Sequence, residues 1–374
     1  MLSRRCALGW LGTACASFAG PGTGAASTGT SATTRVPAEE SRVPAEETRM
    51  PAEETPHERT FMGWPSRYAP WGRDLPSVRG DIAGLARAIA RFEPVVLLAR
   101  PDEADDARRA CGGAVEVLPV PVDDLWLRDT GPTFVRTESG LAGVDTRFNG
   151  WGGKQRHPAD GKVARRLLEH FGIPRIPAPL VTEGGALEVD GDGTLLATES
   201  SIVNDNRNPG RSRAELEAGL KAAFGARKVI WFPGVRGADI TDSHVDGLVR
   251  CTSPGTMLLD RPGPADSEQY HQARAVLTST TDAAGREPEI VDLPRPDPGA
   301  IGRHGEDFFG SYINYYVAGG AVIAPAFGDR AADDRAAGIL RELYPGREVV
   351  GVRIDHIAEG GGGIHCATQQ QPRR

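Results

Sequence analysis

From residue 59 onward the sequence predicts an α/β fold made of repeated helix-and-strand units in a single domain. Five amphipathic helical stretches alternate with short runs rich in β-branched residues. The chain has 374 residues, 39% of them hydrophobic and 25% charged, which is enough to bury a large core. Periodicity leaves open whether the strands form one open sheet or a closed ring of units.

The helical stretches carry apolar residues at helical spacing and show recognisable ends. The clearest of them begins with a capping box formed by Ser212 and Glu215 and stops at Gly225. We predict helices over residues 81–92, 160–171, 212–224, 267–280 and 331–344.

The intervening runs are short and apolar, as expected of buried strands. The turn sequence Asp190-Gly191-Asp192-Gly193 separates two such runs and predicts a hairpin. Further strands are predicted over residues 94–99, 228–232, 256–259, 321–323 and 349–354.

The first part of the chain has a different composition. Residues 1–26 resemble an export signal of the twin-arginine type, with Arg4-Arg5 ahead of an apolar region over residues 7–19. The alternative is a cytoplasmic enzyme that starts further downstream. Residues 27–49 are predicted to be a disordered linker with a Pro-containing heptapeptide repeat, and residues 50–374 to be one catalytic domain.

Composition excludes several classes of partner. The net charge of −7 argues against nucleic acid, and no apolar stretch reaches the roughly 18 residues of a membrane span. Beyond the leader the cysteines are Cys111, Cys251 and Cys366, without a CxxC pair, so no structural metal site is predicted. A Cys111–Cys251 disulfide stays open, as does the oligomeric state, with a homo-oligomer among the options.

A cysteine near the C-terminus is a candidate nucleophile. Four consecutive glycines over residues 360–363 suit a backbone that takes unusual dihedral angles or approaches another group closely. Cys366 follows three residues later, and a thiolate in such a shaped, polar site is reactive. The alternative is an inert buried cysteine.

Polar clusters elsewhere admit both a structural and a catalytic interpretation. Asp129 follows Trp126 and Arg128, as in a surface turn with a salt bridge, and Glu183 precedes a Gly-Gly pair, as at a solvated strand end. His244 and Asp246 would share one face of a strand, because residues two apart do so. This last pair suits acid–base chemistry or a metal.

Taken together, a cysteine, a histidine and three carboxylates suit nucleophilic attack on a guanidinium carbon. Opposed carboxylates can hold the planar cation in front of a thiolate. A histidine can then protonate the departing nitrogen and activate a water. The predicted partner is a small cationic guanidine.

These residues lie in motifs that resemble, in order, those of agmatine deiminases in the guanidine-modifying pentein superfamily. The resemblance covers nearly the whole chain after the leader. The motifs are Met50-Pro51-Ala52-Glu53, Trp126-Leu127-Arg128-Asp129-Thr130-Gly131-Pro132, Gly150-Trp151-Gly152-Gly153-Lys154, Glu183-Gly184-Gly185, Asn206-Arg207-Asn208-Pro209, His244-Val245-Asp246 and Gly363-Ile364-His365-Cys366-Ala367-Thr368-Gln369-Gln370-Gln371-Pro372.

The resemblance implies a pentein α/β-propeller, with five αββαβ-like units around a pseudo-fivefold axis and a central site. No cofactor or metal is expected. The implied roles are Cys366 as nucleophile, His244 as general acid and base, Glu183 as the partner of His244 and of a substrate nitrogen, Asp129 and Asp246 as the guanidinium clamp, and Trp126 and Gly363 as residues beside the substrate.

The implied reaction is hydrolysis of agmatine to N-carbamoylputrescine and ammonia through a covalent thiouronium on the cysteine. The alternatives are a peptidylarginine or free-arginine deiminase of the same fold, an amidinotransferase, and a pentein-fold protein that binds its ligand without catalysis.

Overall fold

The structure is a computed structural model that describes residues 48–263 and 267–374. The predicted export signal and nearly all of the predicted linker lie outside the described residues. Among the helices of the described part, none is long and apolar enough to cross a membrane.

The described strands are short. They are β1 (His57–Gly63), β2 (Val95–Leu98), β3 (Val115–Leu118), β4 (Thr133–Thr137), β5 (Gly140–Asp145), β6 (Arg175–Pro177), β7 (Glu188–Val189), β8 (Thr194–Thr198), β9 (Lys228–Phe232), β10 (Val249–Ser253), β11 (Thr256–Arg261), β12 (Glu289–Pro294), β13 (Tyr316–Ala318), β14 (Ala321–Ala326), β15 (Glu348–Arg353) and β16 (Thr368–Pro372).

The helices between them range from single turns to four turns. The α-helices are α1 (Leu75–Ile89), α2 (Ala104–Cys111), α3 (Leu127–Thr130), α4 (Gly150–Gly153), α5 (Val163–His170), α6 (Glu199–Ile202), α7 (Arg213–Phe224), α8 (Ser267–Thr278), α9 (Arg330–Leu343) and α10 (Asp355–Ala358). The 3-10 turns are η2 (Gly72–Asp74), η3 (Asp160–Lys162), η4 (Gly184–Ala186) and η5 (Val245–Gly247).

The strands form five small sheets that repeat one arrangement. Four sheets have the orders β4-β5-β6, β7-β8-β9, β10-β11-β12 and β13-β14-β15, and the fifth has the order β16-β1-β2-β3. In each, one strand pairs antiparallel on one side and parallel on the other, as β8 does with β7 and β9. A helix crosses between the two parallel strands, as a parallel connection requires.

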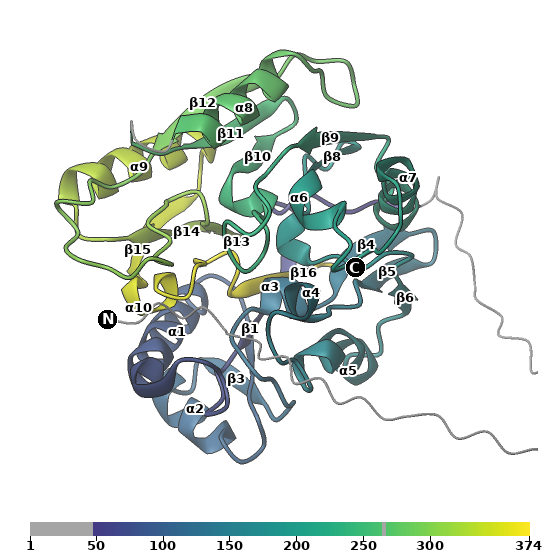
Figure 1. Cartoon of the computed structure of the whole chain (residues 1–374). Coiled ribbons are helices and arrows are strands. Elements are labelled where there is room, and N and C mark those ends of the chain that lie inside the picture. Colours follow the sequence, from purple (N-terminus) through teal and green to yellow (C-terminus); the bar gives the residue numbers. More distant parts are fainter. Residues whose placement is uncertain (1–47, 264–266) are drawn as a thin grey trace, which may run out of the picture. The chain divides into compact units, whose positions relative to one another are not determined.

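The C-terminal strand closes the repeat. β16 pairs antiparallel with β1, which pairs parallel with β2, so the last strand of the chain completes the first sheet. Figure 1 shows the crossover helices α1, α5, α7, α8 and α9 around the outside of the strands. The structure therefore shows that the five units form a closed set. Periodicity alone had left open whether the strands form one open sheet or a closed ring of units.

All five predicted helical stretches are helical, with shifted ends. The best prediction is α7, where the Ser212 side chain accepts from the Glu215 backbone and Gly225 ends the helix with a left-handed conformation. The prediction for α1 began too late, because the helix already starts at Leu75 with a proline in its first turn. Sequence analysis missed α2, a two-turn helix dominated by charged residues.

The predicted hairpin is also confirmed, since β7 and β8 pair antiparallel across the turn. Asp190 Oδ1 accepts hydrogen bonds from the backbone N–H groups of Asp192 and Thr194, which close the turn. Gly191 and Gly193 both take positive φ values there, 68° and 95°.

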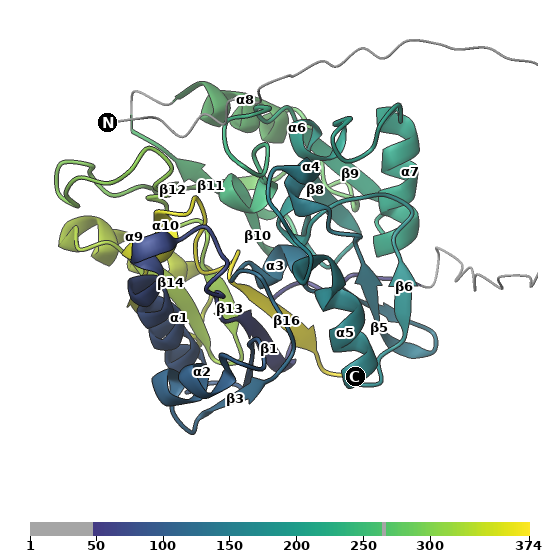
Figure 2. The same ribbon diagram turned by 60° about the horizontal axis from the view of Figure 1, so that its bottom comes forward.

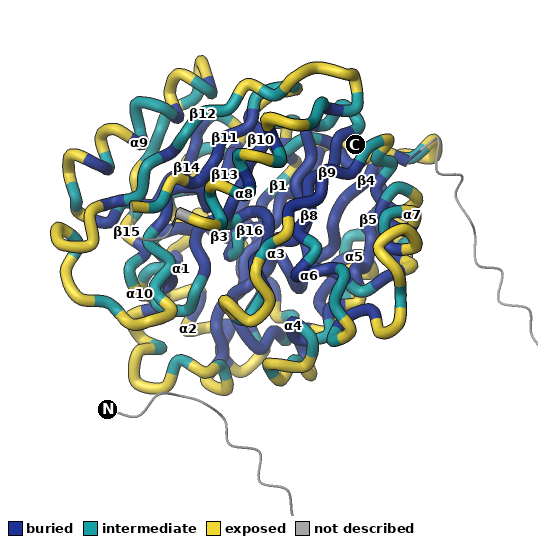
Figure 3. The backbone as a smooth tube through the Cα atoms, turned by 45° about the horizontal axis from the view of Figure 1, so that its top comes forward, coloured by how far each residue is buried: buried dark blue, intermediate teal, exposed yellow. Residues whose placement is uncertain are grey.

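The core lies between each helix and its sheet. Figure 3 shows that most strands are buried along most of their length, whereas helices expose their outer faces. The strands β6, β12 and β15 are more exposed. Cys111 and Cys251 lie in different hydrophobic clusters and are both free, so the disulfide left open by the sequence is absent. Near the centre, α3 packs against β16, as Figures 1 and 2 show. The turn η4 packs against both α3 and η5.

Candidate active site

The candidate nucleophile lies in the turn between α10 and β16. A β-carbon on Gly360 or Gly362 would collide with the rings of Trp71 and Trp126, so the glycine run is needed for these rings to pack directly against the backbone. The ring of Trp126 thereby comes beside the Cys366 β-carbon, as expected of a residue that lines the site.

Cys366 itself is held from two sides. Its backbone N–H donates to Asn314 Oδ1 (3.1 Å), and its Sγ lies 3.5 Å from Asp246 Oδ2. Gly363 packs against Asn314, which places it near the nucleophile, while its contact with substrate stays a prediction. Burial, together with the nearby carboxylates of Asp246 and Asp129, raises the pKa of the Cys366 thiol well above its ordinary value.

Asp129 lies on the one-turn helix α3 and is almost fully buried. Its Oδ2 accepts from Trp151 Nε1 (2.8 Å) and its Oδ1 from the backbone N–H of Gly185 (3.0 Å). The pKa of Asp129 is raised, because burial, together with the charges of Asp246 and Glu183, outweighs the opposing effect of His244.

The surface-turn interpretation of the neighbouring arginine is wrong. Arg128 is 3% exposed and does not pair with Asp129. Its Nη1 donates to Gln370 Oε1 (2.8 Å) and its Nη2 lies 3.3 Å from Glu53 Oε2. The arginine therefore fixes α3 against β16 and the start of the domain.

The strand predicted around the histidine is a 3-10 turn. His244 has an extended conformation directly before η5, and Asp246 lies within η5. The two preceding residues, Asp242 and Ser243, have φ values of 64° and 65°, a sharp turn that no strand could contain. The prediction that His244 and Asp246 face one site is nevertheless correct. They meet because the backbone turns at η5, and not because they share one face of a strand.

Three polar atoms converge on Gly185. A β-carbon there would lie 2.7 Å from His244 Nδ1, 2.9 Å from Asp129 Oδ1 and 3.1 Å from Asp246 Oδ2. In the described part of the chain His244 Nδ1 has no hydrogen-bond partner, although its side chain is buried. A buried nitrogen without a partner beside two carboxylates indicates a place for a polar ligand.

Glu183 fixes the other side of the imidazole. This carboxylate is fully buried rather than solvated, and its Oε2 lies 3.3 Å from His244 Nε2. Arg207 Nε donates to it at 2.9 Å. Burial alone would lower the pKa of His244, but the carboxylates of Asp129 and Glu183 outweigh it and raise the pKa to about 9.

The structure thus brings Cys366, His244, Glu183, Asp129 and Asp246 into one cluster. Of these five side chains, Cys366 is the one that is partly exposed, as a nucleophile open to substrate must be. Several further residues hold the cluster in place, and none of them was assigned a role from the sequence. All but two of them stand in the motifs that resemble those of agmatine deiminases. They are Glu53, Trp71, Trp151, Arg207, Asn314 and His365.

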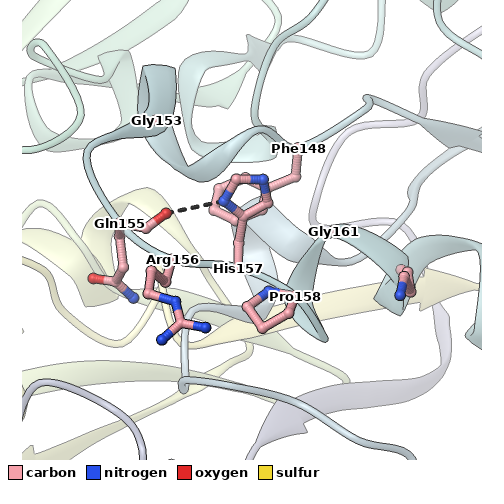
Figure 4. A pocket seen from close by; sticks show the side chains of 8 residues that line it. Phe148, Gly153, Gln155, Arg156, His157, Pro158 and Gly161 are labelled. Carbon is pink, nitrogen blue, oxygen red and sulfur yellow. Dashed lines mark hydrogen bonds between the residues drawn. The ribbon is translucent and has the colours of Figure 1, made fainter. Parts of the chain in front are cut away.

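A separate cavity of about 590 Å³ opens beside the loop that carries Trp151. It contains none of the five clustered residues. Figure 4 shows the ring of His157 against Phe148, with its Nδ1 bonded to the Gln155 carbonyl (2.9 Å). Because Phe148 also packs edge-on against Trp151, these contacts brace the tryptophan that donates to Asp129.

The sequence resembles those of known agmatine deiminases. The sequence is 40% identical over 344 residues to the agmatine deiminase of Stutzerimonas stutzeri, covering 85% of this chain and 93% of that protein. It is 38% identical over 352 residues to the agmatine deiminase of Medicago truncatula, covering 85% and 94%.

A solved structure of the agmatine deiminase of Enterococcus faecalis superposes with a TM-score of 0.82 at 29% identity, covering 89% of this chain and 98% of that chain. The pentein fold predicted from the resemblance is thereby confirmed. Residues 49–372 match the sequence pattern of the Porphyromonas-type peptidyl-arginine deiminases. This chain therefore belongs to the Porphyromonas-type peptidyl-arginine deiminase family.

Proposed function

We propose that this protein hydrolyses agmatine to N-carbamoylputrescine and ammonia. The observation that carries the proposal is the convergence of His244, Asp129 and Asp246 on Gly185, with the Cys366 thiol beside Asp246. Two carboxylates suit a planar cation with several N–H groups, and the protonated imidazole beside them can pass its proton to a departing nitrogen.

The first half of the reaction forms a covalent intermediate. The Cys366 thiolate attacks the guanidinium carbon, which makes a C–S bond. His244 donates its proton to one terminal nitrogen, the C–N bond breaks, and ammonia leaves behind a thiouronium. The raised pKa of His244 keeps it protonated for this step at neutral pH.

The second half consumes water. His244, now neutral, takes a proton from a water molecule, whose oxygen attacks the thiouronium carbon. The C–O bond forms, the C–S bond breaks, and the ureido product leaves the thiol free. Glu183 holds the imidazole in both halves through its contact with Nε2.

The substrate's own charge supports the formation of the nucleophile. In the empty site the carboxylates of Asp246 and Asp129 disfavour a thiolate, so the pKa of Cys366 is high. A guanidinium placed between these carboxylates and the sulfur supplies the missing positive charge. Reactivity is therefore coupled to the arrival of a cation.

The surroundings favour a tail that lacks a carboxylate. The three cations in the motifs are all engaged elsewhere. Arg128 contacts Glu53 and Gln370, Lys154 contacts Asp242 at 2.8 Å, and Arg207 pairs with Glu183 and Asp242. Beside the nucleophile lies the ring of Trp126, which packs against Trp71, and aromatic rings suit an alkyl chain and an ammonium group. These features support agmatine over free arginine.

The decisive experiment measures ammonia and ureido release from agmatine, free arginine and an arginine-containing peptide side by side. We expect kcat/KM for agmatine to exceed that for arginine at least about tenfold, roughly 1.4 kcal/mol of transition-state binding. Cys366→Ala should remove turnover without unfolding the protein. If kcat/KM for arginine or the peptide equals or exceeds that for agmatine, the proposed substrate is wrong. If Cys366→Ala keeps its turnover, the proposed covalent mechanism is wrong.

We also propose, from residues 1–26 of the sequence, that the protein is exported. N-terminal sequencing of the protein from the cell of origin should find a mature terminus near residue 27. Cytosolic protein that still carries Met1, or a terminus near Met50 that arises from internal initiation, would contradict export.

A further inference from the structure

His365, the residue before the nucleophile, lies between two carboxylates. Its Nδ1 is 2.7 Å from Asp246 Oδ2 and its Nε2 is 2.7 Å from Glu53 Oε2. The side chain is almost completely buried. Glu53 belongs to the first residues of the described domain and lies 312 positions earlier in the chain.

Both contacts demand a proton on the ring. An ionised carboxylate can only accept hydrogen bonds, and a neutral imidazole has one N–H group to donate. Burial favours protonated carboxyl groups, yet the charges of Arg250 and Arg128 favour ionised Glu53, and the charges of His244 and Arg250 favour ionised Asp246. Two anions flanking the ring therefore require both of its nitrogens to donate, which only an imidazolium can do.

We propose that His365 is a positioning residue, an imidazolium that holds the Asp246 carboxylate ionised and aimed at the guanidinium beside the Cys366 sulfur. The inference rests on the proposed guanidine chemistry, because it assigns Asp246 to the substrate cation. His365 itself contacts Asp246 rather than the reacting atoms, so it acts through that carboxylate.

The surrounding charged groups point to His365 as the counter-ion of Asp246. Among the described side chains, His365 is the cation that is hydrogen-bonded to Asp246. The other hydrogen-bond partners of Asp246 are the Asn314 amide and the Cys366 thiol. The remaining charged groups that face the pair engage one another or lie further from Asp246. They are Arg128 and Arg250 beside Glu53, Glu188 beside Arg250, and His244 and Asp129 across the site.

The chain offers a matched control in a second buried histidine. His57 lies 2.7 Å from the Glu53 carbonyl oxygen through Nε2 and 3.1 Å from Glu93 through Nδ1. It is about as buried as His365 but does not contact Asp246. Replacing it disturbs the same part of the fold and leaves the clamp alone.

The test compares two alkylating agents on His365→Gln, His57→Gln and the wild type. Chloroacetamidine carries a cationic amidinium that the carboxylates can hold, whereas iodoacetamide is neutral and reports on the thiol alone. We expect the ratio of their inactivation rates to fall about tenfold or more in His365→Gln, because a charge-assisted contact to Asp246 is lost. In His57→Gln the ratio should stay within about twofold of wild type, since no contact to the clamp changes.

The pH dependence gives a readout that a purely structural role would not move. Without the imidazolium the pKa of Asp246 rises, so the preference for the amidinium should fade at a higher pH as the solution is acidified. An unchanged ratio and acid limb in folded His365→Gln, or an equal loss in His57→Gln, would overturn the proposal.

A second variant keeps the histidine and changes its partner. In Glu53→Gln the amide can donate to Nε2, so the ring no longer needs a proton on both nitrogens. The amidinium preference at neutral pH should then be weaker than in the wild type. An unchanged preference in Glu53→Gln would contradict the proposal even if His365→Gln fails to fold.

Failure of the inference and failure of the proposed function are separable. The two alkylating agents need the thiol and the carboxylates but not agmatine. A wild type that prefers chloroacetamidine yet releases no ammonia from agmatine would reject the substrate and leave the role of His365 intact.

Discussion

The two carboxylates of the clamp differ in what surrounds them. Asp129 on α3 is held by neutral donors, the indole N–H of Trp151 and a backbone N–H. Asp246 on η5 is held by the imidazole of His365. Both are buried to about the same extent, and burial raises the pKa of each, yet the net direction is upward for Asp129 and downward for Asp246.

This difference shows that the partner rather than the burial decides the charge of a carboxylate here. Asp246 is a permanent anion with its own counter-ion, and it lies next to the nucleophile. Asp129 depends on His244 and on an incoming guanidinium to stay ionised. Asp246 is therefore the preset member of the clamp, since it is ionised before substrate binds. Asp129 is the substrate-dependent member, since the arriving guanidinium helps to keep it ionised.

Removing the preset member should have the largest effect. Asp246→Asn loses the charged contact to substrate and leaves His365 with one carboxylate instead of two, so kcat/KM for agmatine should fall by about 10³-fold or more. Steady-state kinetics measure this loss, with the thermal unfolding midpoint as a check that the variant is folded. A fall smaller than that of Asp129→Asn would reverse the ranking of the two carboxylates.

Removing the substrate-dependent member should cost less and move the alkaline limb. Asp129→Asn removes a charged partner worth about 1.5–3 kcal/mol, roughly 10- to 100-fold in kcat/KM. Because Asp129 helps to raise the pKa of His244 to about 9, its loss lowers that pKa. The activity, which needs protonated His244, should then decline at a lower pH. A pH–rate profile with an unmoved alkaline limb would contradict this coupling.

Removing the indole N–H that Trp151 donates to Asp129 should have the smallest effect and sharpen the contrast between the two carboxylates. Trp151→Phe keeps an aromatic ring against Phe148 but removes the indole N–H from Asp129. A neutral hydrogen bond contributes about 1 kcal/mol, so kcat/KM should fall roughly fivefold. The ratio of chloroacetamidine to iodoacetamide inactivation at low pH, which reports on Asp246, should not change. A loss as large as that of Asp129→Asn would mean that Trp151 does more than hold this carboxylate.

Local features of the sequence were predictable because they depend on neighbours a few residues apart. Helical periodicity placed α5, α7, α8 and α9 close to their observed bounds, and the capping box and the hairpin turn were both correct. Where charge masked the apolar face, as in α2, the same reasoning failed. The glycine run before Cys366 also pointed to a close approach, which the packing of Gly362 against Trp126 bears out.

The sequence by itself determined the kinds of residue available for the chemistry and the turns that carry them. Tertiary structure decided how they meet. It closed the five units through β16 and β1, turned His244 and Asp246 around η5 instead of along a strand, and seated Glu53 against His365 from 312 positions away. The reason is physical: dihedral preference and periodicity act over a few residues, whereas the charge of a buried carboxylate depends on whichever distant group the fold packs against it.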